Sequence, residues 1–530
     1  MKKILYVLFA AFLVLGLTGC NLFPTGPVDP TDPPEEALHN SAHCLCSGTA
    51  DGVGEHTCLT VEGWTEVRTA DELIAAIDGS ATAPAYVYLG ASITVEGGLF
   101  VPSGADVTIC LGGKTITADT VNYGYLNITD CQNNTGVWTS NSSYTVRTLA
   151  QGVTNLYAGK MTSNGATEDA QVMVVDGEKY DEMPGGIATL NMYGGIIEST
   201  HKTTNPGSNV SLLYKGVFYM YDGLITGGYV RANDTVPQIP SGSKTTADKF
   251  GGNVALKRDG AEMYMYGGEI SDGYICFFNA DGGMEKGTSG AWGGNIGVWN
   301  GKLYIYGGTV ADGEAVGNGG NIGMGSYGNI HIEGCTITGG VSSNFGGNFY
   351  ISGGSQAEVY FKNATIEYGD AVGGGGNIFV QALAKGFTLE DCSVTDGFCT
   401  NEISGGIGLQ GTTFTVTLKG SNYFADNYGC DIHLRHRNGL EGYARLSVSG
   451  ATAAENPILL AAGKHAYQVT IDAPQVALDT LFAAADGSKI AIREVEVEGG
   501  AMNALFVSPS SLNFDWEVTA EPETPAEPAA

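Results

Sequence analysis

Residues 293–308 read GGNIGVWNGKLYIYGG, and residues 319–334 read GGNIGMGSYGNIHIEG. Each stretch opens on Gly-Gly-Asn, continues with a short apolar alternation, and closes on a second alternating segment that ends in glycine. Similar segments that return at a nearly constant interval indicate an architecture built from stacked structural repeats. These two stretches therefore predict a fold made of stacked repeats.

The repeat extends over much of the chain. The Gly-Gly-Asn unit begins at Gly251, Gly293, Gly319, Gly346 and Gly375, and a degenerate copy follows at 405–407, so the intervals are 42, 26, 27, 29 and 30 residues. A second unit of alternating apolar residues recurs in step with it, with copies at 190–195, 218–223, 263–268, 303–308, 330–335, 359–364 and 387–392 and an outlying copy at 126–131.

The alternation within each unit predicts strands with one buried face. Leu303 and Ile305 should point inward, and Tyr304 and Tyr306 outward. A period near 28 residues leaves room for about three short strands per turn, and 80 glycines among 530 residues are too dense for helix interiors. The sequence predicts an all-β fold, a right-handed parallel β-helix whose coils stack at roughly 4.8 Å.

The recurring asparagine favours the same fold. Asparagine tolerates the left-handed backbone of a tight corner, and its side-chain amide can bond the equivalent asparagine one coil away. A phosphate-binding glycine loop would need a following helix, whereas a strand pattern follows here. We expect an internal asparagine ladder that includes Asn321.

The ends of the solenoid, expected over residues 61–515, need covers. Thr69 and Glu72 form a capping box before an apolar segment at 73–77, which predicts a short helix over the N-terminal end. Strand-like segments at 414–418, 445–448, 467–471 and 490–497 continue beyond the last repeat, and we expect the final one to pair as a different cap. Residues 132–185 read as a large insertion, and the segments 231–250 and 277–291 as loops beside Trp292 and Trp299.

The N-terminus has the pattern of an exported protein. Lys2 and Lys3 precede an uncharged apolar run, too short to span a membrane, that ends at Cys20. Residues 1–19 then form a signal peptide, and residues 20–38, rich in proline, form an extended tether. Leu17-Thr18-Gly19-Cys20 resembles the lipobox of bacterial lipoproteins, which implies a lipid on Cys20 as the only membrane anchor. The acidic tail, 516–530, should be disordered.

The net charge of the chain limits the kinds of molecule that it can bind. The formal net charge is −31, from 56 acidic and 25 basic residues. Nucleic acid is excluded because its phosphates need a basic surface, and acidic polysaccharides are disfavoured for the same reason. Neutral glycans, surface proteins of a host or neighbouring cell, and Ca²⁺ stay open as partners. No cofactor is required by this interpretation.

A compact group of thiols and imidazoles occupies residues 39–60. Cys44, Cys46, Cys58 and His56, with His43 nearby, have the donor types of a tetrahedral Zn²⁺ site. A disulfide to Cys58 that leaves one free thiol explains the same residues equally well. Either arrangement would stiffen a short segment and would not be catalytic.

The Asp-Gly pairs at 222–223, 272–273, 312–313 and 396–397 predict turns rather than Ca²⁺ sites.

Tyrosines recur at outward positions of the second unit. Tyr221, Tyr266 and Tyr306 should share one column, with Tyr193, and Tyr264 and Tyr304 a neighbouring one, with Tyr219 and Tyr360. Aromatic faces at coil spacing suit the stacking of sugar rings, and a self-stacking ladder that stabilises the sheet suits the same pattern. Trp292 and Trp299 complete the candidate ligand-binding residues.

These repeats resemble right-handed parallel β-helix proteins of the pectin-lyase-like fold and the Gly-Gly-Asn repeats of polymorphic bacterial surface adhesins. The resemblance covers roughly residues 85–500 and is specific for fold rather than function, since the fold carries lyases, hydrolases and adhesins. Lyases of this fold use an arginine base, yet no arginine lies between Asp259 and Leu434. Arg435 and Arg437 read as solvated charges on an outer face.

No catalytic residue is therefore assigned. We expect a lipid-anchored, surface-exposed protein of the bacterial envelope that acts in adhesion or glycan binding. A polysaccharide lyase or glycoside hydrolase with an unfamiliar site is the first alternative, and a structural surface spacer is the second.

Overall fold

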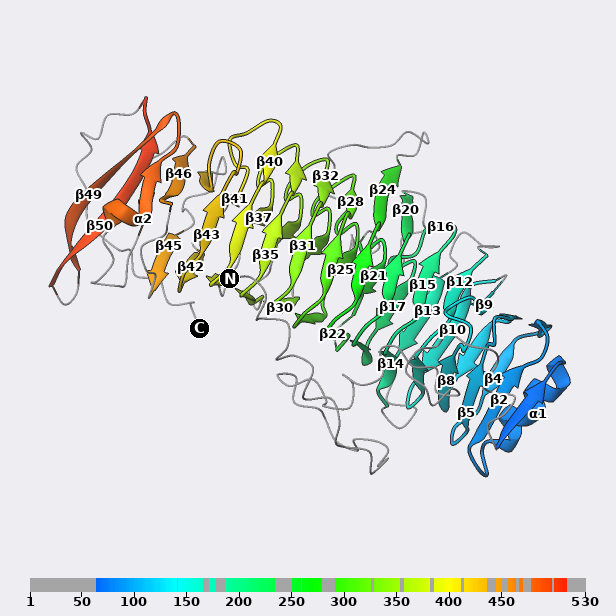
Figure 1. The fold of residues 1–530 in the computed structure, drawn as a ribbon. Coiled ribbons are helices and arrows are strands. Elements are labelled where there is room, and N and C mark those ends of the chain that lie inside the picture. Colours follow the sequence, from blue (N-terminus) through cyan, green and yellow to red (C-terminus); the bar gives the residue numbers. More distant parts are fainter. Residues whose placement is uncertain are drawn as a thin grey trace, which may run out of the picture.

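The chain folds as an elongated parallel β-helix in the computed structural model (Figure 1). The structure describes residues 63–511, apart from 141, 165–170, 178–185, 234–249, 259, 279–290, 326–327, 353–356, 382–385, 411–413, 436–444, 450–455, 464–466, 470–477 and 498–499. The predicted signal peptide, tether, Cys/His segment and acidic tail lie outside these residues. The predicted fold class is confirmed.

Four parallel sheets form the walls of the solenoid, and the chain visits them in the order A, B, D, C in the coils that have all four. Sheet A consists of β1 (Trp64–Val67), β2 (Ala85–Leu89), β5 (Asp106–Cys110), β8 (Tyr125–Thr129), β11 (Val153–Leu156), β14 (Ala188–Met192), β18 (Gly216–Met220), β22 (Glu262–Met265), β26 (Lys302–Ile305), β30 (Asn329–Glu333), β34 (Val359–Lys362), β38 (Phe387–Glu390), β42 (Thr415–Lys419) and β45 (Arg445–Ser449). Sheet B consists of β3 (Ile93–Thr94), β6 (Thr115–Thr117), β9 (Val137–Thr139), β12 (Lys160–Ser163), β15 (Ile196–Ser199), β19 (Leu224–Thr226), β23 (Glu269–Ser271), β27 (Thr309–Ala311), β31 (Thr336–Thr338), β35 (Thr365–Glu367), β39 (Ser393–Thr395) and β43 (Tyr423–Ala425).

The other two walls meet at the corner that carries the Gly-Gly-Asn units. Sheet C consists of β4 (Leu99–Val101), β7 (Thr120–Asn122), β10 (Tyr144–Leu149), β13 (Gln171–Asp176), β17 (Val210–Leu213), β21 (Val254–Leu256), β25 (Ile296–Val298), β29 (Ile322–Met324), β33 (Phe349–Ile351), β37 (Ile378–Gln381), β41 (Ile407–Gln410), β44 (Ile432–Arg435), β46 (Ile458–Ala462) and β48 (Phe482–Ala484). Sheet D is shorter and consists of β16 (Lys202–Thr203), β20 (Tyr229–Asn233), β24 (Tyr274–Phe278), β28 (Glu314–Ala315), β32 (Val341–Ser342), β36 (Asp370–Ala371) and β40 (Phe398–Cys399).

The core runs along the whole solenoid. Leu303 and Ile305 of β26 are fully buried, as their alternation predicts, while Tyr304 is half-buried on the outer face. One continuous apolar cluster extends from Val67 near the N-terminal end to Val507 near the C-terminal end. Because successive coils add inward side chains to the same cluster, the described part of the solenoid has one continuous core.

The asparagine ladder is confirmed and longer than the Gly-Gly-Asn copies alone indicate. Side-chain amides link consecutive asparagines over 2.6–2.8 Å from Asn209 to Asn377 through Asn253, Asn295, Asn321 and Asn348. Each oxygen of the ladder from Asn253 to Asn377 also accepts a backbone N–H from a glycine near the start of sheet D. These asparagines are fully buried, so the ladder satisfies polar groups that water cannot reach.

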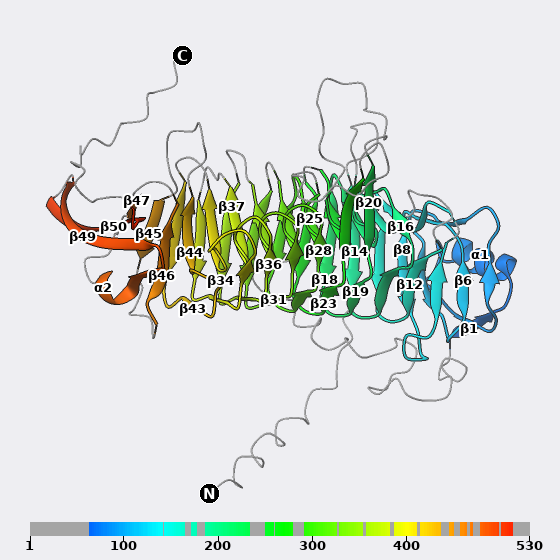
Figure 2. The ribbon, with the colours of Figure 1, turned by 90° about the horizontal axis from the view of Figure 1, so that it is seen from above.

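The two ends of the solenoid are covered differently. At the N-terminal end, α1 (Ala70–Gly79) begins with the predicted capping box between Thr69 and Glu72 and buries Leu73 and Ile77 against the core (Figure 1). At the other end, β47 (Tyr467–Val469), β50 (Gly500–Pro509) and β49 (Ser488–Val497) form an antiparallel sheet, and the short α2 (Leu478–Leu481) lies between β47 and β49 in the chain. Figure 2 shows this sheet beyond the last parallel strands.

Two expectations need correction. The prediction of three strands per coil is wrong for the seven coils that carry sheet D, whose strands are mostly two residues long and show no clear alternation. The stretch 132–185 is not an insertion on the scaffold, because it contributes β9 to β13 to the regular sheets. Its coils lack Gly-Gly-Asn, so the repeated motif does not reveal them.

Candidate binding surfaces

One column of stacked tyrosines runs along the edge of sheet A. Tyr157, Tyr193, Tyr221, Tyr266 and Tyr306 each follow a strand of sheet A directly, in five consecutive coils. Their ring centroids are 4.8, 4.9, 5.3 and 5.5 Å apart, and neighbouring planes differ by at most 18°. The spacing is close to the distance between strands, so the rings stand parallel along the solenoid axis.

A second column lies beside the first, at the outward position within the strands of sheet A. Tyr219, Tyr264 and Tyr304 stack there with centroids 5.1 and 4.8 Å apart. The same column begins with an amide ladder, in which Asn155 links Asn127 to Asn191 over 2.7 Å in both steps, and continues beyond Tyr304 into His331 and Tyr360. We call the eight tyrosines of the two stacks the tyrosine face. The alternation of the repeats predicts the outward position of seven of these tyrosines. It does not predict that of Tyr157, which lies in the stretch 132–185, where the sequence predicts an insertion.

Stacking determines which parts of the tyrosine rings are left uncovered. Each interior ring has a neighbour against both faces, so only the edges of these rings and those hydroxyl groups that are not shielded are left open. The Tyr264 hydroxyl donates to Glu262 over 2.7 Å, and the hydroxyl of Tyr266 is shielded from solvent. Burial raises the pKa of Tyr221 and Tyr264, so these hydroxyls keep their protons at neutral pH and act as hydrogen-bond donors.

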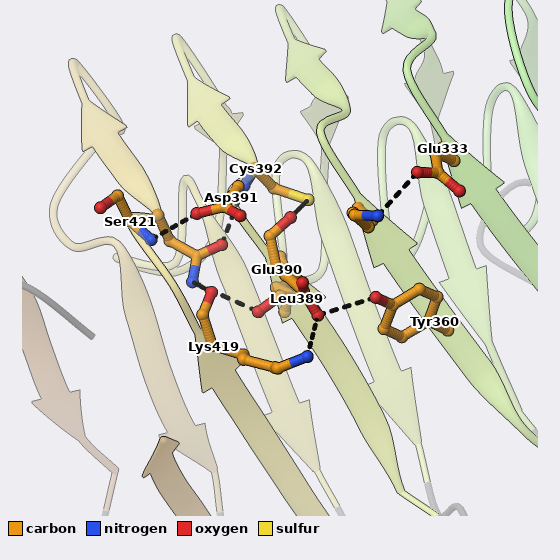
Figure 3. A network of polar contacts seen from close by, with 10 residues as sticks. Glu333, Tyr360, Leu389, Glu390, Asp391, Cys392, Lys419 and Ser421 are labelled. Atoms are coloured by element: carbon orange, nitrogen blue, oxygen red, sulfur yellow. Dashed lines mark hydrogen bonds and ion pairs between the residues drawn. The ribbon is translucent and has the colours of Figure 1, made fainter. Parts of the chain in front are cut away.

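Beyond the tyrosines, the first column becomes a row of alternating charges. Glu333, Lys362, Glu390 and Lys419 are register neighbours in successive strands. Lys362 contacts Glu333 over 2.9 Å, and Figure 3 shows Tyr360 and Lys419 converging on Glu390. The contact with Lys362 lowers the pKa of Glu333, and the contacts with Lys419 and then Tyr360 lower that of Glu390. The charges compensate one another and leave this end of the face without a net basic patch.

Trp292 and Trp299 belong to a different surface, on the outer face of sheet C. Their rings lie 5.4 Å apart and continue towards Tyr350, at 5.9 Å from Trp292. Glycines make room for them, since a Cβ atom at Gly325 would lie 2.4 Å from the Trp292 ring. We call this surface the aromatic row, and it also contains Phe250, Phe345 and Phe379. Phe379 points outward yet is fully buried, so much of the row is a second apolar layer rather than an open platform.

Arg435 lies at the end of the aromatic row, and the interpretation of this residue as a solvated charge is wrong. Its guanidinium lies 5.1 and 5.2 Å from the ring centroids of Phe345 and Phe379 and pairs with Glu402. The side chain is only 15% exposed. Glu402 comes from a loop 33 residues earlier in the chain, a contact that only the folded coil creates. Arg437 lies outside the described residues.

The remaining predicted sites divide into two groups. Cys20, Cys44, Cys46, His56 and Cys58 lie outside the described residues, so lipidation and the choice between zinc and a disulfide stay predictions. Within the residues that the structure describes, no three His, Cys, Asp or Glu side chains gather as a metal site would require. The predicted Asp-Gly turns are present, with positive φ at Asp272, Asp312 and Asp396, and at Gly223 in the first pair.

Comparisons with protein-family models, with curated proteins and with solved structures give no match for this chain. A search of the described residues finds no helix of the length and apolarity that crossing a membrane demands.

Proposed function

We propose that the protein is a lipid-anchored adhesin or glycan-binding protein of the bacterial surface, and that the tyrosine face binds a neutral polysaccharide. The observation that carries this proposal is the pair of in-register tyrosine columns, which repeat aromatic rings at the spacing of the coils. A polysaccharide repeats its hydroxyl groups along the chain in a comparable manner. Several weak contacts made together give useful avidity without any single deep pocket.

The physical state of the rings supports this assignment. Rings held between stacked neighbours lose little conformational freedom on binding, which lowers the entropic cost of recognition.

The net charge of −31 disfavours anionic polymers and leaves neutral sugars as the preferred class of ligand. The repeat pattern and the parallel sheets also lead us to assign the fold to the pectin-lyase-like group, whose members include carbohydrate-active proteins.

A structural spacer is the second candidate, and one observation favours it. The ring faces, which usually contact sugars, are occupied by neighbouring tyrosines, so the stacks also stabilise the solenoid. The two functions differ in one measurable property, because a spacer keeps its rigidity but binds no glycan. An enzyme of the lyase or hydrolase class would differ from both by releasing shortened or unsaturated products.

The test separates ring stacking from hydroxyl contacts. Changing Tyr304 and Tyr306 together to Phe retains both rings and removes two hydroxyls. On an array of neutral polysaccharides, we expect the parent protein to bind and this variant to bind about 10- to 100-fold more weakly, with an unchanged melting temperature. Tyr423→Phe, an exposed tyrosine of sheet B, is the matched control and should bind as the parent does.

The location is tested separately. Cys20→Ala should leave the protein unprocessed or release it from the membrane fraction, because the lipid is the proposed anchor. A variant that fractionates with membranes as the parent does contradicts the anchor. If no neutral glycan binds and no product is released, the spacer function is the one supported.

A further inference from the structure

Two cysteines meet on the outer face of sheet A, close to the N-terminal end of the solenoid. Cys110 is the last residue of β5, and Cys131 lies two residues beyond the end of β8, the neighbouring strand. The two side chains belong to a small buried cluster with Tyr88, against which Trp64 packs, and this cluster is separate from the main core. Exposure is 0% for Cys110 and 4% for Cys131.

The corner that holds the two thiols is fixed by a carboxylate. Asp130 accepts backbone N–H groups from Gly113 and Gly136, each over 2.8 Å, and so connects the turns of two consecutive coils. The two adjacent thiols are therefore held in defined positions by the fixed turns. The interaction with Cys131, followed by burial, raises the pKa of the Cys110 thiol far above its ordinary value, which disfavours the thiolate in the folded pair.

We propose that Cys110 and Cys131 form a disulfide bond in the mature protein, which staples two consecutive coils beside the N-terminal cap. This inference rests on the proposed export, because disulfides persist in oxidising compartments. Each thiol loses its proton and one S–S bond forms. A small-molecule disulfide of the glutathione class accepts the two electrons and leaves as two thiols. The bond forms while the coils close, and burial then protects it from reductants.

The position gives the bond a mechanical role. In a solenoid, each coil contacts only its neighbours, so separation of coils begins at an end. The proposed anchor precedes the N-terminal cap in the chain, so a pull on a bound ligand is transmitted through the first coils. A covalent link between those coils prevents their separation at the point where load enters.

The other buried cysteines provide an internal contrast. Cys335 and Cys392 occupy one column that follows sheet A, but Ala364 of the intervening coil lies between them. Two coil steps place them about 10 Å apart along the axis, beyond the reach of a disulfide. Both should remain thiols in the same sample, and Cys335→Ala is therefore a matched control variant.

The experiment uses the full chain refolded with oxidised and reduced glutathione. Denatured protein is alkylated with iodoacetamide and digested with trypsin, which cuts after Lys114 and so places Cys110 and Cys131 on different peptides. We expect the two peptides to be recovered as one cross-linked species, two hydrogens lighter than their sum. Cys335 and Cys392 should be recovered in alkylated form. In the folded protein the bond should resist dithiothreitol, and in urea it should be reduced.

The second readout is the melting temperature. Oxidised parent protein and oxidised Cys335→Ala should melt at a higher temperature than their reduced forms, whereas Cys110→Ala and Cys131→Ala should show no difference between the two conditions. Recovery of both peptides in alkylated form, or of Cys110 joined to another cysteine, overturns the proposal. Because oxidation is imposed in vitro, a failure of the proposed surface location would appear in cell fractionation and not in this result.

Discussion

Asn321 donates a hydrogen bond from its side-chain amide to the side-chain oxygen of Asn348, one coil further along the solenoid, over 2.7 Å. The same side chain donates to the carbonyl of Thr338 and accepts from Asn295 and from the backbone of Gly313. All four bonding positions of the amide are therefore used, in a site that is closed to water. Each interior member of the ladder connects three coils in this way.

Replacing Asn321 with Ala should lower the free energy of unfolding by about 1–3 kcal/mol, because several buried donors and acceptors lose their partner. Urea denaturation followed by circular dichroism measures the change. Asn401→Ala is the control, since Asn401 is exposed and lies outside the ladder. A midpoint for Asn321→Ala that equals that of the control would show that the ladder contributes nothing to stability.

Much of the ladder could be predicted from sequence, and the reason for the exceptions is physical. Gly-Gly-Asn marks the corner because Gly251, Gly293 and their equivalents adopt positive φ, which glycine permits without steric cost. Asn209 occupies the first position of the ladder after Gly207 and Ser208, and the motif does not reveal it. An asparagine amide can join the ladder at any coil whose backbone forms the same corner. The ladder therefore includes coils that lack the Gly-Gly-Asn motif.

Gly323 tests the close packing on the outer face of sheet C. A Cβ atom there would lie 2.5 Å from the backbone nitrogen of Gly293 and 2.7 Å from Cβ of Trp292, so the backbone would have to shift. We expect Gly323→Ala to destabilise the protein by about 1–3 kcal/mol, as overpacking does elsewhere. Gly79→Ala is the matched control, because a Cβ at Gly79 meets no atom within 4 Å. Equal melting temperatures for the two variants would contradict the packing of the aromatic row.

The charge row predicts a dependence on pH. Lys419 and Tyr360 lower the pKa of Glu390, so the folded protein holds this carboxylate ionised to a lower pH than the unfolded chain does. The stabilisation is complete above the ordinary glutamate pKa, about 4.3, and is lost as pH falls through the folded value. The melting temperature should therefore decrease below that pH, and Glu390→Gln should show a smaller decrease. Thermal melts between pH 3 and 7 compare the two. A parallel decrease in parent and variant would exclude Glu390 as a source of the dependence.

The surfaces were harder to predict than the core. Alternation assigns Tyr304 and Tyr306 to the outside correctly, because one buried face requires it. It gives no information on ring orientation, which depends on the tyrosines one coil before and after. Alternation gives no information on the surroundings of Arg435 for the same reason, since its partner Glu402 becomes adjacent only when the coil closes. The sequence pattern predicts whether a side chain faces the core or the outside of the solenoid. Its contacts on the outer surface depend on residues of other coils, which the local pattern does not contain.

The tyrosine face provides the last prediction, and Tyr266 is its most informative residue. Its ring lies between Tyr221, at 5.3 Å, and Tyr306, at 5.5 Å. Stacked aromatic pairs contribute about 0.5–1.5 kcal/mol each, so Tyr266→Ala should cost about 1–3 kcal/mol of stability. Tyr266→Phe preserves both contacts, and its shielded hydroxyl should contribute little to glycan binding. Tyr306→Ala should cost less than Tyr266→Ala, because its other neighbour, His331, is tilted by 46°. Urea midpoints and glycan affinities measured on the same samples separate the two roles of the column. If Tyr266→Ala abolished binding without a loss of stability, the stack would serve as a ligand platform alone and the ladder interpretation would be wrong.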